Sequence, residues 1–134
     1  MKEDIMRLIE TLDSRPSVAF AYLFGSKVKG FATDRSDWDI AIYFSEPLEE
    51  VGHWPAFELE AELSRTVGST VQVIVLNILP PPILGFQIVS SGVVLIDRDE
   101  NLRMDFENRT LRQYYDWQYF LKRQMNAERR LSPI

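Results

Sequence analysis

Hydrophobic positions along the 134-residue chain alternate between helical and strand-like spacing. Residues 2–13 carry apolar side chains three or four positions apart, which predicts an amphipathic helix that ends before Pro16. Residues 18–24 are an unbroken apolar run, VAFAYLF, which is typical of a strand buried on both faces. A turn or short helix at GSKVKG follows, and residues 38–44, WDIAIYF, form the next predicted strand.

The second half of the chain repeats this interleaving. We expect an amphipathic helix at residues 55–67, whose glutamates form a solvated face and which ends at Gly68. Further expected elements are a strand at 70–76, a helix from Pro82 to about Ser91, a strand at 93–96 and a long helix at about 99–130. The pattern predicts one α+β (α/β-like) domain spanning residues 1–134, with a small mixed sheet flanked by helices.

Composition narrows the chemistry that is open to this domain. The chain has no cysteine and one histidine, so any bound metal is expected to have oxygen ligands. The net charge of −5 argues against direct binding to nucleic acid. No apolar run is long enough to cross a membrane, and charged residues are spread through the first ten positions, so we expect a cytoplasmic protein.

Two aspartates stand at the start of the second predicted strand. Period-two geometry directs Asp37 and Asp39 to one side of the sheet and Trp38 to the other. Two carboxylates about 5 Å apart repel each other by roughly 3 kcal/mol at an effective dielectric near 20, unless a cation lies between them. Magnesium prefers such oxygen ligands and completes its shell with water and substrate phosphates, so the pair predicts a Mg²⁺ site.

The first strand ends at a glycine-serine pair. Gly25 has no side chain to obstruct a phosphate, and the Ser26 hydroxyl can donate a hydrogen bond to one. An Asp-x-Asp pair alone is more often a feature of a turn or strand end. Its combination with Gly-Ser at a fixed offset, between two predicted strands, is a much stronger signal of a nucleoside triphosphate site.

Gly25-Ser26, ten residues and Asp37-Trp38-Asp39 resemble the signature of the DNA polymerase β-like nucleotidyltransferases, and the short chain is similar to their minimal nucleotidyltransferase (MNT) branch. The resemblance implies that Gly25 and Ser26 contact the phosphates of ATP and that Asp37 and Asp39 hold catalytic Mg²⁺. It also implies that Lys27 and Lys29 contact the nucleotide, in place of arginines in relatives; two exposed, solubilising lysines are the alternative.

One position departs from the family pattern. Relatives often carry a third acidic residue on the later strand, where this chain has Gln72. An amide cannot act as a carboxylate base and is a weaker metal ligand, so deprotonation of the acceptor and binding of a second metal are in question.

The predicted C-terminal helix is rich in aromatic side chains. Those expected to bind a partner protein are Tyr114, Tyr115, Trp117, Tyr119 and Phe120. A helix that packs only on its own core needs a single apolar stripe, whereas exposed Trp and Tyr are typical of interface anchors. The alternative is that these rings cover the back of the sheet.

The family resemblance implies a specific partner and reaction. MNT proteins of this kind are typically antitoxins that transfer AMP from ATP to a tyrosine of a HEPN ribonuclease toxin. Two alternatives remain: an antitoxin that acts by binding alone, which Gln72 favours, and a nucleotidyltransferase that modifies a small molecule, which would need additional substrate-binding structure.

Overall fold

The structure, a computed structural model, describes residues 2–29, 37–46 and 54–131. The helices are α1 (Lys2–Asp13), α2 (Ser26–Lys29), α4 (Trp54–Val67), α5 (Pro82–Ser91) and α6 (Glu100–Leu131). The strands are β1 (Val18–Phe24), β2 (Trp38–Phe44), β3 (Val71–Val75) and β4 (Val93–Asp97). The predicted order and type of these elements are confirmed.

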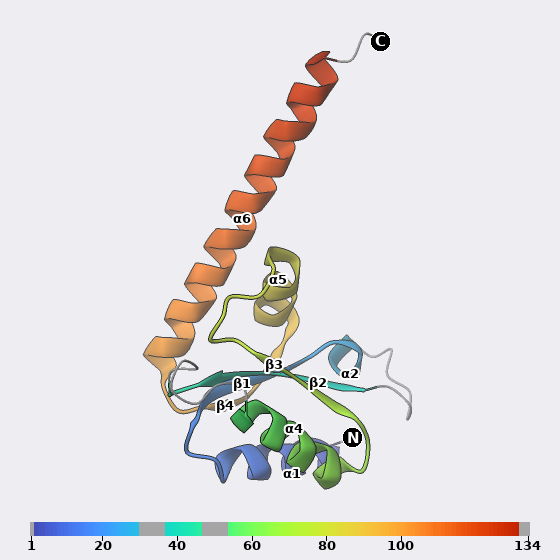
Figure 1. Ribbon diagram of the computed structural model, residues 1–134, viewed down its shortest axis with the longest axis vertical. Coiled ribbons are helices and arrows are strands. Elements are labelled where there is room, and N and C mark those ends of the chain that lie inside the picture. The colour runs from blue at the N-terminus through green and yellow to red at the C-terminus, as the bar shows by residue number, and fades with distance from the viewer. Residues whose placement is uncertain (1, 30–36, 47–53, 132–134) are drawn as a thin grey trace.

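The four strands form one mixed sheet in the order β3-β2-β1-β4 (Figure 1). Strand β1 is antiparallel to both β2 and β4, whereas β2 and β3 are parallel. Helices α1 and α4 cover one face of the sheet, and α5 and α6 lie on the other (Figure 1). All seven residues of β1 are buried because helices cover both of its faces.

The core is divided by the sheet into two layers. Between the sheet and α1 and α4 lie side chains such as Leu8, Ile40 and Leu63, each completely buried. On the other face, Phe20 packs in a tilted arrangement on Phe106 of α6, with ring centroids 5.6 Å apart. Alternate residues of each strand therefore contact different helices.

Helix α5 packs closely against the first half of α6. A Cβ atom on Gly85 would lie 2.7 Å from the Thr110 Cγ2 atom, so only glycine permits this approach. Thr110 is buried and its hydroxyl donates to the Phe106 carbonyl oxygen. The second half of α6 extends beyond α5 (Figure 1), and every residue from Tyr119 to Arg130 is exposed.

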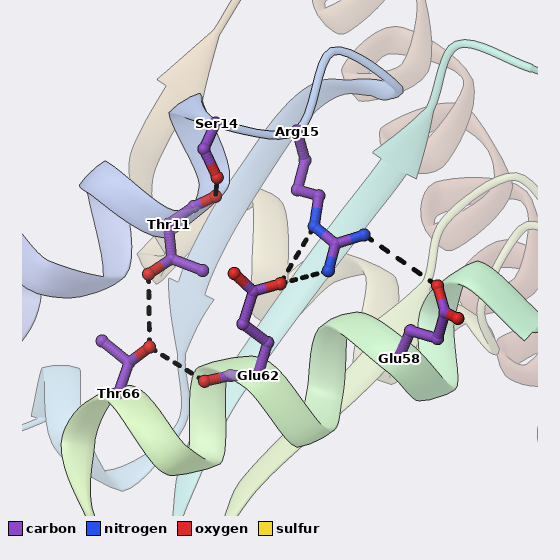
Figure 2. Close-up of polar contacts among 6 residues, drawn as sticks. All are labelled: Thr11, Ser14, Arg15, Glu58, Glu62 and Thr66. Atoms are coloured by element: carbon purple, nitrogen blue, oxygen red, sulfur yellow. Dashed lines mark hydrogen bonds and ion pairs between the residues drawn. The ribbon is translucent and has the colours of Figure 1, made fainter.

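The glutamates of α4 do more than form a solvated face, which corrects the sequence-based expectation. Glu62 accepts hydrogen bonds from the Arg15 guanidinium, which also lies 4.0 Å from a Glu58 carboxylate oxygen (Figure 2). Thr11 and Thr66 are hydrogen bonded across the same junction, joining α1 to α4 (Figure 2). Glu60 accepts a hydrogen bond from the Val73 backbone amide of edge strand β3.

Arg98, which follows β4, ties the turn between α1 and β1 to the sheet. Its guanidinium donates to the carbonyl oxygens of Asp13, Arg15 and Val18. These acceptors include the carbonyl oxygen of Asp13, the last residue of α1, where a positive charge is also favourable.

We expect Arg98→Ala to lower the free energy of unfolding by about 1–3 kcal/mol, because several charge-assisted hydrogen bonds are lost at a partly exposed site. Arg7→Ala is the matched control, since Arg7 only approaches Asp4 at 4.0 Å on the surface of α1. Urea denaturation monitored by circular dichroism measures both variants. Equal stability of the two variants would contradict the role given to Arg98.

Candidate active site

The candidate site lies where β1 ends and β2 and β3 begin. In the sheet register, Phe24 of β1 pairs with Asp39 of β2, and Asp39 pairs in turn with Gln72 of β3. The Trp38 amide donates to the Thr70 carbonyl oxygen, which aligns the starts of the two parallel strands. Residues far apart in the sequence are thereby brought to one edge of the sheet.

The alternation of β2 gives Asp39 its direction. Trp38 and Ile40 are buried in the layer with α1 and α4, whereas Ala41 belongs to the layer with α5 and α6. Asp39 alternates with Ile40 and is therefore on the side of α5 and α6. Asp39 is half-buried and Asp37, which precedes the strand, is exposed.

Gly25 lies directly against the Asp39 carboxylate. Its φ angle of +82° lies in the left-handed region that favours glycine. A Cβ atom at this position would lie 2.3 Å from the Asp39 Oδ2 atom, so the carboxylate occupies the space that a side chain would need. Glycine is required here both for the backbone conformation and for the approach of Asp39.

Burial and a neighbouring like charge both act on the Asp39 carboxylate. Burial, and then the negative charge of Asp37, raise the pKa of Asp39 above its ordinary value. The described residues contain no group of three or more carboxylate, imidazole or thiolate side chains suited to a metal. Two carboxylates in this electrostatic setting fit a Mg²⁺ ion that takes its remaining ligands from water and phosphate.

Gln72 stands beside this pair. Its Nε2 atom donates a hydrogen bond to the Asp37 Oδ2 atom over 3.2 Å. The side chain is exposed and belongs to the strand next to β2. The chain therefore places an amide next to the two carboxylates.

The residues after Gly25 are arranged on the short helix α2. Ser26 is its first residue and is half-buried, and the Val28 amide closes the turn on the Gly25 carbonyl oxygen. The Lys27 Nζ atom lies 4.7 Å from the ring centroid of Trp38, a cation-π arrangement that sequence reasoning did not anticipate. Lys29 ends α2, and its side chain lies outside the described part of the chain.

A polar network that sequence reasoning missed fixes the base of α6 to β1. The Tyr22 hydroxyl donates to Glu107 over 2.5 Å, and Arg103 binds both Glu107 and Asp97. Burial, followed by the hydrogen bond to Glu107, raises the pKa of Tyr22. The spacing of Arg103 and Glu107 four residues apart was the available sequence signal, but it did not reveal Tyr22 as the third member.

The aromatic residues predicted to bind a partner divide into two groups. Tyr114 stacks on Phe86 of α5, with ring centroids 4.1 Å apart. The ring centroids of Trp117 and Tyr114 are 6.0 Å apart. Tyr115, Tyr119 and Phe120 are 56%, 64% and 60% exposed. The structure thus brings only part of this set against the domain and leaves three rings accessible.

Comparison with known proteins places this geometry in context. The chain is similar to a chain from a crystal structure of a toxin-antitoxin with AMP-PNP, at 26% identity and a TM-score of 0.67. The match covers 98% of each chain. It also shares its fold, at 24% identity and a TM-score of 0.66, with a chain of a tri-AMPylated Shewanella oneidensis HEPN toxin in complex with MNT antitoxin; the match covers 98% of each chain. No curated protein matches the chain.

No described helix is long and apolar enough to cross a membrane.

The family model described as "Polymerase beta, Nucleotidyltransferase" matches residues 6–101, which include Gly25, both aspartates and Gln72. This match covers well over half of the sequence, and the chain therefore belongs to the polymerase beta nucleotidyltransferase family.

Proposed function

We propose that this protein is an antitoxin that transfers AMP from ATP to a tyrosine of a HEPN toxin in a Mg²⁺-dependent reaction. The observation that carries the proposal is the contact between Gly25 and the carboxylate of Asp39, beside Asp37. It joins a backbone suited to phosphate with a carboxylate pair suited to a divalent ion.

Each residue of the site has a role in this reaction. Asp37 and Asp39 would hold Mg²⁺, and Gly25 and Ser26 would bind the outer phosphates of ATP. Lys27 and Lys29 would add positive charge near the phosphates. When bound, Mg²⁺ neutralises phosphate charge and orients the α-phosphate. The tyrosine oxygen of the acceptor forms a bond to the α-phosphorus, pyrophosphate leaves with its bridging oxygen, and the phenolic proton is released.

The placement of α6 supports a protein acceptor. Asp39 is on the side of the sheet that α5 and α6 cover, so a partner bound to the exposed part of α6 approaches the same side. The exposed rings of Tyr115, Tyr119 and Phe120 provide apolar area for such a partner. The neighbour solved with AMP-PNP is described as a toxin-antitoxin, which agrees with this arrangement.

A second candidate function is neutralisation of the toxin by binding alone. Gln72, an amide next to the aspartate pair, favours this alternative because it supplies no third negative charge. The two functions differ in whether protection from the toxin depends on Asp37 and Asp39.

We expect the wild-type protein to label its HEPN partner when ATP and Mg²⁺ are present, with one AMP mass per modified tyrosine. Asp37→Asn and Asp39→Asn should each reduce the rate of AMP transfer at least about 100-fold. Loss of an outer-shell partner of a metal typically lowers activity up to about 100-fold, and loss of a metal ligand should lower it at least as much. Intact-mass analysis of the toxin measures the modification. Asp4→Asn on α1, which covers the opposite face, is the control. Normal labelling by the double variant D37N/D39N would contradict the metal assignment.

Gly25→Ala should abolish Mg²⁺-dependent ATP binding, since the new methyl group would displace the Asp39 carboxylate. Gly68→Ala is a matched control: its φ of +71° imposes a similar backbone strain, but its Cβ would meet nothing within 4 Å. We expect both variants to lose about 1 kcal/mol or more of stability and only Gly25→Ala to lose binding. Calorimetry measures the affinity of each variant for ATP in the presence of Mg²⁺. Equal affinity in the two variants would refute the proposed nucleotide site at Gly25.

Phe120→Ala and Tyr119→Ala should weaken the complex with the toxin, each by about 10-fold or more, if these rings are interface anchors. Because both side chains are exposed, folding should be unaffected. Met6→Ala is the control, since Met6 is 55% exposed on α1. Surface plasmon resonance measures the dissociation constants. Affinities equal to that of the control would place the docking surface elsewhere.

A further inference from the structure

We propose that Gln72 is a positioning residue that holds Asp37 and limits the site to one divalent ion. This inference rests on the proposed function, because it takes Asp37 and Asp39 as metal ligands. It goes further by assigning the number of ions and the residue that sets it.

The position of Gln72 is defined by the sheet. Parallel pairing of β2 and β3 puts Gln72 directly beside Asp39, and its Nε2 atom lies 3.2 Å from the Asp37 Oδ2 atom. Gln72 is exposed, so it is not held there by burial in the core. The Gln72 backbone therefore pairs with Asp39, whereas its side chain reaches Asp37, two residues earlier in the chain.

The direction of the amide follows from chemistry. An ionised carboxylate only accepts hydrogen bonds, so Gln72 must present its NH₂ group to Asp37. This contact occupies one oxygen of Asp37 and places the positive end of the amide dipole there. The other carboxylate oxygens remain for a metal, whereas a cation between Asp37 and Gln72 would face the amide hydrogens.

The supply of protein ligands leads to the same limit. The triphosphate brings negative charge of its own, so the number of ions depends on the protein oxygens that can hold them. Two-metal sites hold their ions about 3.5–4 Å apart, and the protein must fix the coordination of both. No group of three or more acidic or histidine side chains suited to a metal occurs in the described ranges. Gln72 occupies the neighbouring position with a neutral group.

The test counts ions directly. Mn²⁺ is titrated into the full-length protein with a saturating non-hydrolysable ATP analogue, and free Mn²⁺ is measured by electron paramagnetic resonance. The ions held by analogue that is not bound to protein are subtracted. We expect one ion per wild-type chain and two per Gln72→Glu chain, since that change replaces the amide by a carboxylate of the same shape. Gln124→Glu, which adds the same charge on the exposed part of α6, should keep one.

A second variant tests the positioning role without adding charge. Gln72→Ala should still bind one ion but about 10-fold more weakly, as expected when an outer-shell partner of a metal ligand is removed. Its exposed position allows this variant to fold even if Gln72→Glu does not.

Two ions in the wild type, or wild-type affinity in Gln72→Ala, would overturn the inference. Transfer of AMP could persist in either case, so the proposed function would survive. A wild-type complex that holds no ion more tightly than the free analogue does would refute both.

Discussion

The close approach of the Asp39 carboxylate to the backbone of Gly25 is the constraint on which the site depends. It requires the antiparallel register that pairs Phe24 with Asp39, because a shift of one residue would turn the carboxylate to the other face of the sheet. It also requires a residue without Cβ at the end of β1. The hydrophobic pairing of β1 and β2 therefore determines the chemistry at their ends.

The two-layered core extends this constraint to the rest of the molecule. Helices α1 and α4 close one face and are joined by Arg15 and Glu62, whereas Asp39 lies on the other face. On that face, Tyr22 and Glu107 connect β1 to the start of α6. The strand that ends at Gly25 is thus bonded to the helix that carries the exposed rings, which fixes the direction in which that helix leaves the domain.

Much of this arrangement could be predicted from local patterns. The apolar run of residues 18–24 and the alternation of residues 38–44 specify a doubly covered strand and the side on which Asp39 emerges. The order and type of the helices followed from spacing, proline and glycine. These signals are local, and the structure confirms them because tertiary packing and local preference agree.

Contacts that depend on strand pairing or on the direction of a long side chain could not be predicted. Nothing in the sequence states that β3 runs parallel to β2, and only that pairing brings Gln72 to Asp37. Lys27 could equally have extended into solvent, and its position over Trp38 depends on where α2 begins. The sequence alone assigns Glu60 to the solvated face of its helix. Its hydrogen bond to the Val73 amide depends on the placement of edge strand β3 beside α4.

The exposed half of α6 limits the free energy that the proposed partner can gain by burying its rings. An isolated helical segment of this length is marginal in water, and most helical stability in proteins comes from packing. Three rings that each carry about 200 Å² of surface, roughly 60% of it exposed, could contribute about 9 kcal/mol if fully buried at 25 cal/mol per Å². Association itself costs about 4–15 kcal/mol. The rings alone therefore cannot hold a tight complex.

A partner must consequently contact more of this chain than Tyr115, Tyr119 and Phe120. Lys122, Arg123, Arg129 and Arg130 follow these rings against a single acid, Glu128, so the end of α6 favours an acidic surface. Helix α5 lies on the same side of the sheet as Asp39 and can supply further contact area. Under the proposed function, a partner large enough to bind tightly along α6 and α5 would extend toward the site. Affinity for the partner would then be linked to access of its side chains to the nucleotide.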